Sequence, residues 1–373
     1  MSWEEKKSEC ISKLPTLLDI LENISLREEA FLLNQGSFRG LFPTHYQEGI
    51  FSTVLDKDGR TYLLPTGLLP FTYFRGESQY HPMCKPSLFR PNMTPSRIFL
   101  ERLRSCELEL LINSHPMTTI FTQGTSVRMP DGTYRPISFS VDTLALAQHY
   151  GICTELLDLT VNKWVAAFFA CTRYVNGKYE PILDDKGYGV FYEYNDHNQW
   201  DDLWATSMSS RKLRPVGLQP FSRPGEQGGY ILQMSKKQNF NKLCTSKIKF
   251  RHDSNVSKLI FNYTNRSKKL FPVGLLDAKA EFIKKSTVFS RLAYNMTISR
   301  FFYQYPKDDI QSWMKEQRVR LQETPIISFT EQEKKEFMRD WQKHAQSFYN
   351  QIFVRLSYMP SEEIEITDGK DLL

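Results

Sequence analysis

The sequence predicts an α+β fold from three observations. Segments whose apolar residues recur at helical spacing are interspersed irregularly with short segments rich in aromatic and β-branched residues. No Gly-rich dinucleotide fingerprint follows a strand-like segment, which argues against a doubly wound parallel sheet. The 373 residues are 40% hydrophobic and 13% aromatic, enough to build a substantial core.

Local patterns place the individual elements along the chain. Helices are expected at residues 3–33, 96–113, 142–147, 162–174, 289–302 and 330–353. Strands are expected at residues 50–55, 61–64, 71–75, 189–194, 230–234 and 256–262. The first two strands read as a hairpin, and Asp142 is placed to cap the third helix. This order predicts an N-terminal helical segment (1–35), one α+β domain (36–305) and a C-terminal helical extension (306–373).

Charge and cysteine content narrow the class of protein. The net charge of +6 permits an anionic ligand but does not imply nucleic acid, because both signs of charge are interspersed over most of the chain. The six cysteines are scattered without a C-x-x-C pair, so free thiols are expected and a metal site is not. No apolar run is long enough to cross a bilayer and no signal peptide is present, so we expect a cytoplasmic protein without a membrane partner.

The stretch 148–170 combines polar groups, a glycine turn and an apolar helix. His149, Tyr150 and Asp158 precede a segment whose apolar positions suit a buried helix face. Backbone N–H groups at a helix start attract anions, so this stretch is a candidate anion site. The alternative is a buried strand, turn and helix in which His149 and Asp158 serve only their own neighbours, with Asp158 capping the helix that begins near Asn162.

A second stretch, residues 73–77, has the sequence Tyr-Phe-Arg-Gly-Glu and reads as the end of a short strand. Arg75 offers a fork of N–H donors that suits phosphate or ribose oxygens. Gly76 would let a flat group approach the backbone closely. The alternative for Arg75 is a buried ion pair with Glu77 or Asp158.

Together these stretches resemble the FRG domain family, named for a Phe-Arg-Gly motif. Residues 74–76 spell that motif, and Gln-His-Tyr-Gly at 148–151 with Leu-Leu-Asp at 156–158 resembles the second conserved piece of the family. A weaker match lies at 223–229, and the resemblance covers roughly residues 60–300. The family recurs in bacterial and phage-linked proteins.

Three positions depart from the usual pattern of the family. Cys153 stands in place of a proline, Glu155 in place of an arginine and Leu159 in place of a tryptophan. The missing cation argues against an anion-binding role at position 155. We expect Glu155 to pair with a nearby lysine or arginine instead.

The motifs also resemble, more distantly, the ADP-ribosyltransferase folds. In those folds an aromatic-Arg-Gly strand is followed by a Thr-containing strand before an Ala/Phe-rich helix, and then by a Glu or Gln at a later strand. Thr160 and the pair Glu226-Gln227 match that order. The resemblance implies a single ADP-ribosyltransferase-like domain of short mixed or antiparallel sheets flanked by helices. It also implies ADP-ribosyl transfer or NAD cleavage in bacterial toxins or anti-phage defence.

The resemblance also implies which residues would act on NAD. Cleaving the nicotinamide–ribose bond builds positive charge on the ribose, which a carboxylate such as Glu226 would stabilise, whereas Gln227 could only hydrogen-bond. His149 or Tyr150 would stack on nicotinamide or bond a ribose hydroxyl. The alternatives are a satisfied core histidine and a polar turn at 226–227. The catalytic candidates are Arg75, His149, Glu226 and Gln227, and the NAD-binding candidates are Phe74, Arg75, Gly76, His149, Tyr150 and Thr160.

The expected partners are NAD or a related nucleotide as substrate and a protein or nucleic-acid acceptor, with no metal. Two other functions stay open. One is a non-catalytic module that binds a nucleotide or nucleic acid through Arg75 and the aromatic surface. The other is a hydrolase with His149 as base, Asp158 as its orienting group and Cys153 as nucleophile.

Overall fold

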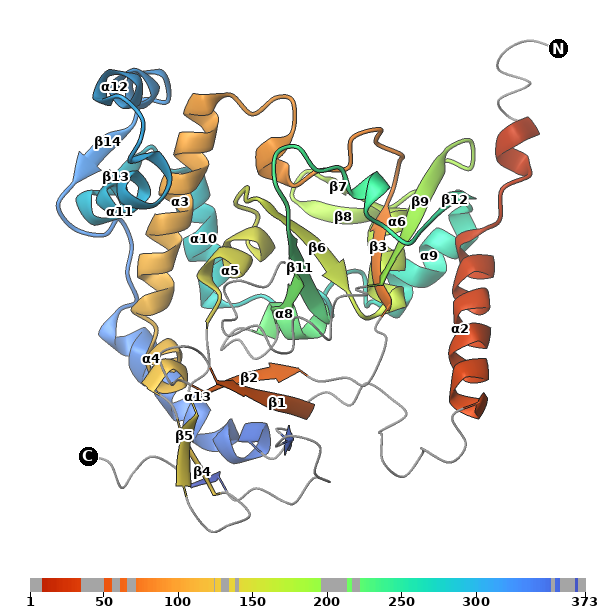
Figure 1. The fold of residues 1–373 in the computed structure, drawn as a ribbon, viewed down its shortest axis with the longest axis horizontal. Helices are drawn as coiled ribbons and strands as arrows, with labels where there is room; N and C mark the ends of the chain where they lie inside the picture. Colours follow the sequence, from red (N-terminus) through yellow and green to blue (C-terminus); the bar gives the residue numbers. More distant parts are fainter. Residues whose placement is uncertain are drawn as a thin grey trace.

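A six-stranded antiparallel sheet lies at the centre of the structure, which is a computed structural model (Figure 1). The strand order is β10-β11-β6-β3-β9-β12, and every neighbouring pair is antiparallel. The strands are β3 (Thr72–Glu77), β6 (Leu156–Thr160), β9 (Tyr188–Asn195), β10 (Leu213–Pro215), β11 (Gly229–Gln233) and β12 (Ser246–Arg251). The α+β class is thereby confirmed.

The structure describes most of the chain. The described residues are 9–34, 50–55, 61–65, 72–123, 125–128, 134–137, 141–195, 213–216, 222–349, 353–355 and 366–367. The expected loop of the first hairpin, residues 56–60, lies outside them, but the flanking strands β1 (Ile50–Leu55) and β2 (Thr61–Pro65) pair antiparallel as predicted.

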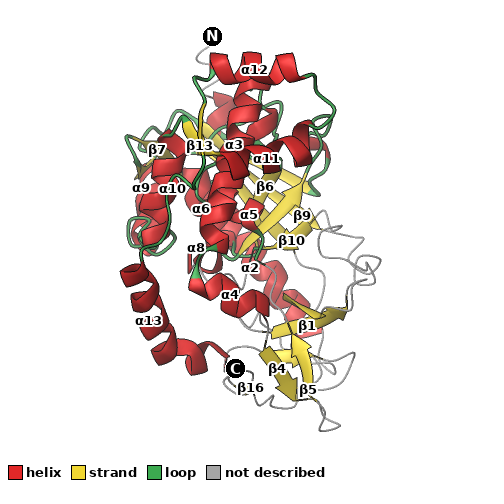
Figure 2. Cartoon of the chain, turned by 90° about the vertical axis from the view of Figure 1, so that its left-hand side faces the viewer, coloured by secondary structure: helices red, strands yellow, loops and turns green. Residues whose placement is uncertain are grey.

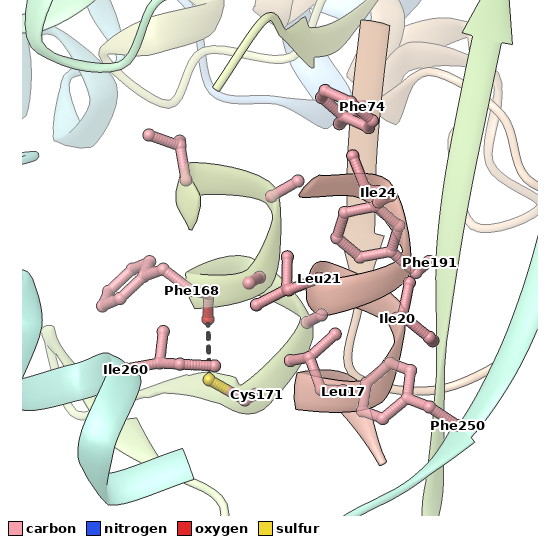
Figure 3. Close-up of a cluster of buried hydrophobic side chains, with 14 of the residues drawn as sticks. Leu17, Ile20, Leu21, Ile24, Phe74, Phe168, Cys171, Phe191, Phe250 and Ile260 are labelled. Atoms are coloured by element: carbon pink, nitrogen blue, oxygen red, sulfur yellow. Dashed lines mark hydrogen bonds between the residues drawn. The ribbon is translucent and has the colours of Figure 1, made fainter. Parts of the chain in front are cut away.

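One face of the sheet is covered by α6 (Lys163–Cys171), with α2 (Leu17–Asn34) and α9 (Ser254–Tyr263) packed beside it. Asn162 caps α6 by accepting a 2.9 Å hydrogen bond from the Trp164 N–H, so Asp158 does not cap this helix. Figure 3 shows the apolar core between these helices and the sheet. The labelled core residues are Leu17, Ile20, Leu21, Ile24, Phe74, Phe168, Cys171, Phe191, Phe250 and Ile260.

A second helical layer is built around α3 (Pro95–Asn113), at the opposite end of the molecule from α2 (Figure 1). Thr94 caps α3 through a 3.3 Å bond from the Arg97 N–H. The helices that contact α3 are α4 (Pro116–Gln123), α5 (Thr143–His149), α10 (Leu275–Lys285), α11 (Arg291–Thr297) and α12 (Lys307–Glu316). Asp142 caps α5 as predicted, since it accepts a 2.9 Å bond from the Ala145 N–H.

Small sheets and α13 (Glu331–Tyr349) lie at one end of the molecule (Figure 2). One of these sheets pairs β15 with the first hairpin, and the other joins β4, β5 and β16. The remaining strands are β4 (Thr125–Arg128), β5 (Tyr134–Ile137), β7 (Thr172–Val175), β8 (Lys178–Pro181), β13 (Val288–Ser290), β14 (Arg320–Gln322), β15 (Phe353–Arg355) and β16 (Ile366–Thr367). The remaining helical elements are α8 (Ser222–Glu226), a short π-helix (Ile298–Phe302) and two 3-10 helices (Ser87–Phe89, Phe240–Lys242).

Several predicted elements differ from the structure. The helix expected at residues 162–174 ends at Cys171, because Thr172–Val175 forms strand β7. The helix expected at 3–33 is interrupted by a turn before α2 begins at Leu17. The strand expected at 256–262 is wrong, because this segment is helix α9. Asp253 caps it by accepting bonds from the N–H groups of Asn255 (2.9 Å) and Val256 (3.1 Å), which starts a helix rather than a strand. The helix expected from residue 289 begins two residues later, because Val288–Ser290 forms strand β13.

Within the described ranges, no helix is both long and apolar enough to cross a bilayer. None of the six cysteines is paired in a disulfide.

Candidate functional site

The central strands β3 and β6 part beside the Phe-Arg-Gly motif. Among the described residues, β3 pairs with β9 at six positions but with β6 only through Phe74 and Thr160. Side chains alternate along a strand, so Phe74 and Gly76 face α6 while Arg75 and Glu77 face the other side. Arg75 is the first residue beyond the last strand pair, where its side chain can reach the backbone of β6.

The Arg75 guanidinium holds the two strands together at this point. Its Nε and Nη2 donate to Glu77 Oε1 at 3.1 and 2.9 Å, and its Nη1 donates to the Asp158 carbonyl oxygen at 2.8 Å. Burial alone would lower the pKa of Arg75, but the nearby negative charges, chiefly that of Glu77, raise it above its ordinary value. The expected ion pair with Glu77 is present, whereas Asp158 is bound through its backbone. These three bonds use one N–H group on each of the three guanidinium nitrogens.

The Glu77 carboxylate is fixed from its other side as well. The Cys84 thiol donates to Glu77 Oε1 at 3.3 Å, and the Tyr192 hydroxyl lies 3.5 Å from Glu77 Oε2 while donating to Asn241 Oδ1 at 3.0 Å. Burial, reinforced by the charge of Glu77, raises the pKa of the Cys84 thiol to about 12. The thiol therefore stays protonated as a donor and is not a nucleophile at neutral pH.

Asp158 links this network to helix α5. Its Oδ2 accepts a 2.9 Å bond from Gln148 Nε2, and Gln148 Oε1 accepts a 2.7 Å bond from the Thr154 hydroxyl. Its Oδ1 is buried and has no hydrogen-bond partner in the described part of the chain. One carboxylate oxygen is thus held in place while the other remains available to a donor.

His149, the last residue of α5, lies beside this carboxylate. Its Nε2 is buried and, among the residues that the structure describes, has no hydrogen-bond partner. Burial lowers the pKa of His149; the charge of Asp158 opposes this, while Arg223 reinforces it. A Cβ atom on Gly229 would lie 3.1 Å from Nε2, so the glycine leaves room for the ring. His149 is thus a neutral imidazole at neutral pH.

Arg223, on α8, is part of the same cluster. Its guanidinium lies over the rings of Tyr150 (5.1 Å) and Phe271 (4.7 Å) and pairs with Asp277 at 3.3 Å. Its Nε is buried and unbonded within the described structure. Sequence reasoning missed Arg223 as a site residue. The spacing of Arg223 in the sequence could have indicated it, since Arg223 precedes Gln227 by one helical turn.

Of three other candidates, Thr160 and Gln227 have structural contacts, and Glu226 is exposed. The Thr160 hydroxyl donates to the Gln227 carbonyl oxygen (2.7 Å), and Gln227 Nε2 donates to the Leu270 carbonyl oxygen (2.9 Å). Glu226, at the end of α8, is exposed to solvent. The pair 226–227 therefore presents one exposed carboxylate and one amide that is already hydrogen-bonded.

Phe74, Gly76 and Tyr150 lie in packed surroundings. Phe74 belongs to the core beneath α2 and α6 (Figure 3). A Cβ atom on Gly76 would lie 1.9 Å from the carbonyl oxygen of Ala166, so this glycine allows α6 to rest directly on β3. Tyr150 is buried with α3 and α10. Each of the three contributes to the shape of the site through packing.

Residues 70–178 match the family model of the FRG domain. The chain carries an FRG domain. Arg75, His149, Asp158 and Thr160 fall inside the matched region, whereas Arg223, Glu226 and Gln227 lie beyond it on α8 and its following turn. Comparisons with curated proteins and with solved structures gave no match.

The structure shows the contacts of two residues at which this FRG domain departs from the family pattern. Glu155 pairs with Arg102 at 2.5 Å, as expected for an acid at this position. Cys153 donates its backbone N–H to Glu101 Oε2 at 2.7 Å, and burial, with the charge of Glu101, raises the pKa of its thiol. A raised pKa disfavours the thiolate that the hydrolase alternative requires.

The described ranges hold no group of three or more His, Cys, Asp or Glu side chains placed to bind a metal.

Proposed function

We propose that the FRG domain binds NAD at the Asp158 cluster and uses it for ADP-ribosyl transfer or NAD cleavage. The observation that carries the proposal is a concentration of unused polar atoms. His149 Nε2, Asp158 Oδ1 and Arg223 Nε are all buried without a hydrogen-bond partner in the described structure, although such atoms are normally paired. The charges of Asp158 and Arg223 both act on His149, so the three groups form one cluster.

The cluster offers the donors and acceptors that a nicotinamide nucleotide needs. Asp158 Oδ1 would accept from a carboxamide or a ribose hydroxyl, and Arg223 Nε would donate to an oxygen. Arg75 would bind phosphate or ribose oxygens at the parted strands through N–H groups that are not used in its bonds to Glu77 and Asp158. Glu226, the exposed carboxylate on α8, would stabilise the positive charge that develops on the ribose.

The arrangement of strands supports the likeness to ADP-ribosyltransferase folds. The aromatic-Arg-Gly strand β3, the Thr160 strand β6 and the strand that follows Glu226-Gln227, β11, are direct neighbours in the sheet. The three motifs, far apart in sequence, thus converge on one part of the sheet. A role in a toxin or in anti-phage defence is proposed from the family resemblance alone, with a protein or nucleic acid as acceptor.

The test is to incubate the purified chain with NAD labelled in its adenylate half and to follow free nicotinamide and labelled products. Glu226→Gln removes the proposed carboxylate at an exposed position, so the fold should be unchanged while turnover falls about 100-fold or more. The matched control is Glu323→Gln, which neutralises an exposed carboxylate on the far side of α3 and should leave turnover unchanged. Wild type that neither binds nor consumes NAD would sink the proposal.

The alternative of a non-catalytic nucleotide-binding module is resolved by the same experiment. Calorimetric binding of NAD that is weakened by Arg223→Gln, with no release of nicotinamide, would identify a binding module. Release of nicotinamide by wild type would exclude it.

A further inference from the structure

Two segments, 78–85 and 235–249, form one continuous surface at the β12 end of the sheet. Asn239 Nδ2 and Asn241 Nδ2 donate to the carbonyl oxygen of Pro82 at 3.0 and 3.1 Å, so the segments are bonded side by side. We call this surface the lysine ledge, because its charged residues are all lysines: Lys85, Lys236, Lys237, Lys242, Lys247 and Lys249.

The ledge holds a large share of the charge imbalance of the chain. It contains six lysines and no carboxylate, while the whole chain has a net charge of +6, so the remaining residues sum to zero. Five of the six lysines are exposed. Such a one-signed surface on an otherwise balanced protein attracts a polyanion.

Lys247 and Lys249 are held in fixed positions over aromatic rings. They alternate with Ile248 and Phe250 along β12, so their side chains share one face of the strand. Lys247 Nζ lies 5.4 Å from the centre of the Tyr80 ring, and Lys249 Nζ lies 5.1 Å from the same ring. A ring orders an ammonium group without neutralising it, so both charges stay available to a ligand.

The ledge lysines form no ion pair with any residue that the structure describes. Other lysines do: Lys163 pairs with Glu28 at 2.6 Å and Lys279 with Glu333 at 3.1 Å. On the ledge, Lys85 donates to the Lys236 carbonyl oxygen, which leaves its charge uncompensated. The positive charge of the ledge is therefore presented to solvent.

Apolar and aromatic groups lie among these charges. Tyr80 and Tyr188 are half-buried, with Lys249 Nζ 5.1 Å from the Tyr188 ring as well. Met83 is 52% exposed and Leu243 is 38% exposed. Cations interleaved with stacking surfaces are the arrangement that binds unpaired bases on a flexible phosphate backbone.

The simpler explanation is that the lysines protect β12, which is an edge strand, from pairing with another chain. It accounts for Lys247 and Lys249, which lie on the strand. It does not account for Lys236, Lys237 and Lys242, which precede the strand.

We propose that the lysine ledge binds single-stranded nucleic acid. A single strand fits better than a duplex because its bases are free to contact Tyr80, Met83 and Leu243, whereas a duplex offers only phosphates at this surface. The inference does not depend on NAD chemistry. The ledge nevertheless adjoins the Arg75 network, because Asn241 on the ledge accepts a hydrogen bond from the hydroxyl of Tyr192, which lies beside Glu77.

The test is fluorescence anisotropy with labelled single strands about 16 nucleotides long, as RNA and as DNA. The variant Lys247→Gln/Lys249→Gln should weaken binding about ten- to thirtyfold at 0.1 M salt, and should reduce the slope of log affinity against log salt by about 1.4, the value for two lost contacts to a single strand. The control Lys307→Gln/Lys315→Gln makes the same change of charge on the distant helix α12, and should alter binding less than about twofold.

A second variant separates base recognition from charge. Tyr80→Leu should weaken the binding of single strands about fivefold more than it weakens the binding of inorganic polyphosphate, because only the nucleic acid has bases to stack. Equal affinity for polyphosphate, duplex DNA and single strands would overturn the proposal in favour of a general polyanion surface. Preferential binding to anionic vesicles or to an acidic peptide would overturn it too, as would an absence of binding. These measurements do not involve NAD turnover. They therefore test nucleic-acid binding independently of the enzyme assay.

Discussion

Arg75 Nη1 donates a 2.8 Å hydrogen bond to the backbone carbonyl oxygen of Asp158, on the neighbouring central strand. At this point β3 and β6 share no further strand pair, so the side chain takes the place of a backbone bond. The same guanidinium holds Glu77 in an ion pair. The arginine of the Phe-Arg-Gly motif is thus a bridge between strands and the partner of a buried carboxylate.

Arg75→Ala should destabilise the protein by about 3–5 kcal/mol, because it leaves the Glu77 carboxylate buried without its cation. Arg75→Lys keeps the charge but loses the fork of donors, so we expect a smaller loss. Urea unfolding at neutral pH measures the loss of stability in both variants. The comparison is Arg291→Ala, which breaks an exposed pair with Glu323 and should leave the midpoint unchanged. Equal midpoints for Arg75→Ala and wild type would show that the pair contributes nothing.

Gly76→Ala should cost about 1–3 kcal/mol or more, since the new methyl group would lie 1.9 Å from the Ala166 carbonyl oxygen and 2.7 Å from the Ala170 Cβ. Helix α6 would have to move away from β3 to accept it. Gly274→Ala is the control, because its Cβ would meet nothing closer than 3.7 Å. Thermal unfolding compares the two. A Gly76→Ala protein as stable as the control would mean that α6 shifts without loss.

The elements that the sequence predicted best are those with a local cause. Asp142 marks the start of α5, and β3 and β9 follow from apolar runs bounded by turns. The segment 256–262 was misjudged because its Leu-Ile-Phe run looks like a strand, while its cap at Asp253 lies outside that run. Strand β12 went unnoticed, although its alternation of lysine with Ile248 and Phe250 is the pattern of a half-buried strand.

The candidate site could be predicted only where a motif spells it. Arg75 and His149 stand in short recognisable stretches, and the ion pair with Glu77 was among the expected alternatives. Arg223 stands in the weaker match at 223–229, but its contacts could not be predicted, because Tyr150, Phe271 and Asp277 come to it from distant segments. Such a convergence depends on the tertiary fold and has no signature within one stretch of sequence.

His115 makes the packing of α4 and α13 sensitive to acid. Its ring is 2% exposed and lies 4.9 and 4.2 Å from the ring centres of Phe329 and Phe337, and its Nδ1 accepts the Met117 N–H. Burial lowers the pKa of His115 from 6.5 to about 4. The unfolded chain therefore takes up a proton first as the pH falls. Stability from this residue is fully present above pH 6.5 and is lost between 6.5 and about 4.

The expected loss over that range is about 3 kcal/mol, from a pKa difference of about 2.5 units. His115→Gln does not titrate, so its stability should decline less steeply than that of wild type, although it starts lower. Urea unfolding at several pH values in this range gives the slope of the free energy of unfolding against pH for each of the two proteins. Equal slopes for the two proteins would contradict the prediction that His115 causes this loss of stability. Other buried histidines affect both proteins equally and cancel in the comparison.

The charges of Asp158 and Arg223 act on His149 in opposite directions. The negative charge of Asp158 raises its pKa and the positive charge of Arg223 lowers it, both against a larger lowering by burial. Asp158→Asn should therefore lower the pKa of His149 further, whereas Arg223→Gln should raise it. NMR titration of the His149 ring, assigned by its disappearance in His149→Gln, measures both shifts. Opposite signs are the expected result, because both charges act on one imidazole. Shifts of the same sign, or none, would separate Arg223 from the cluster and remove it from the proposed NAD site.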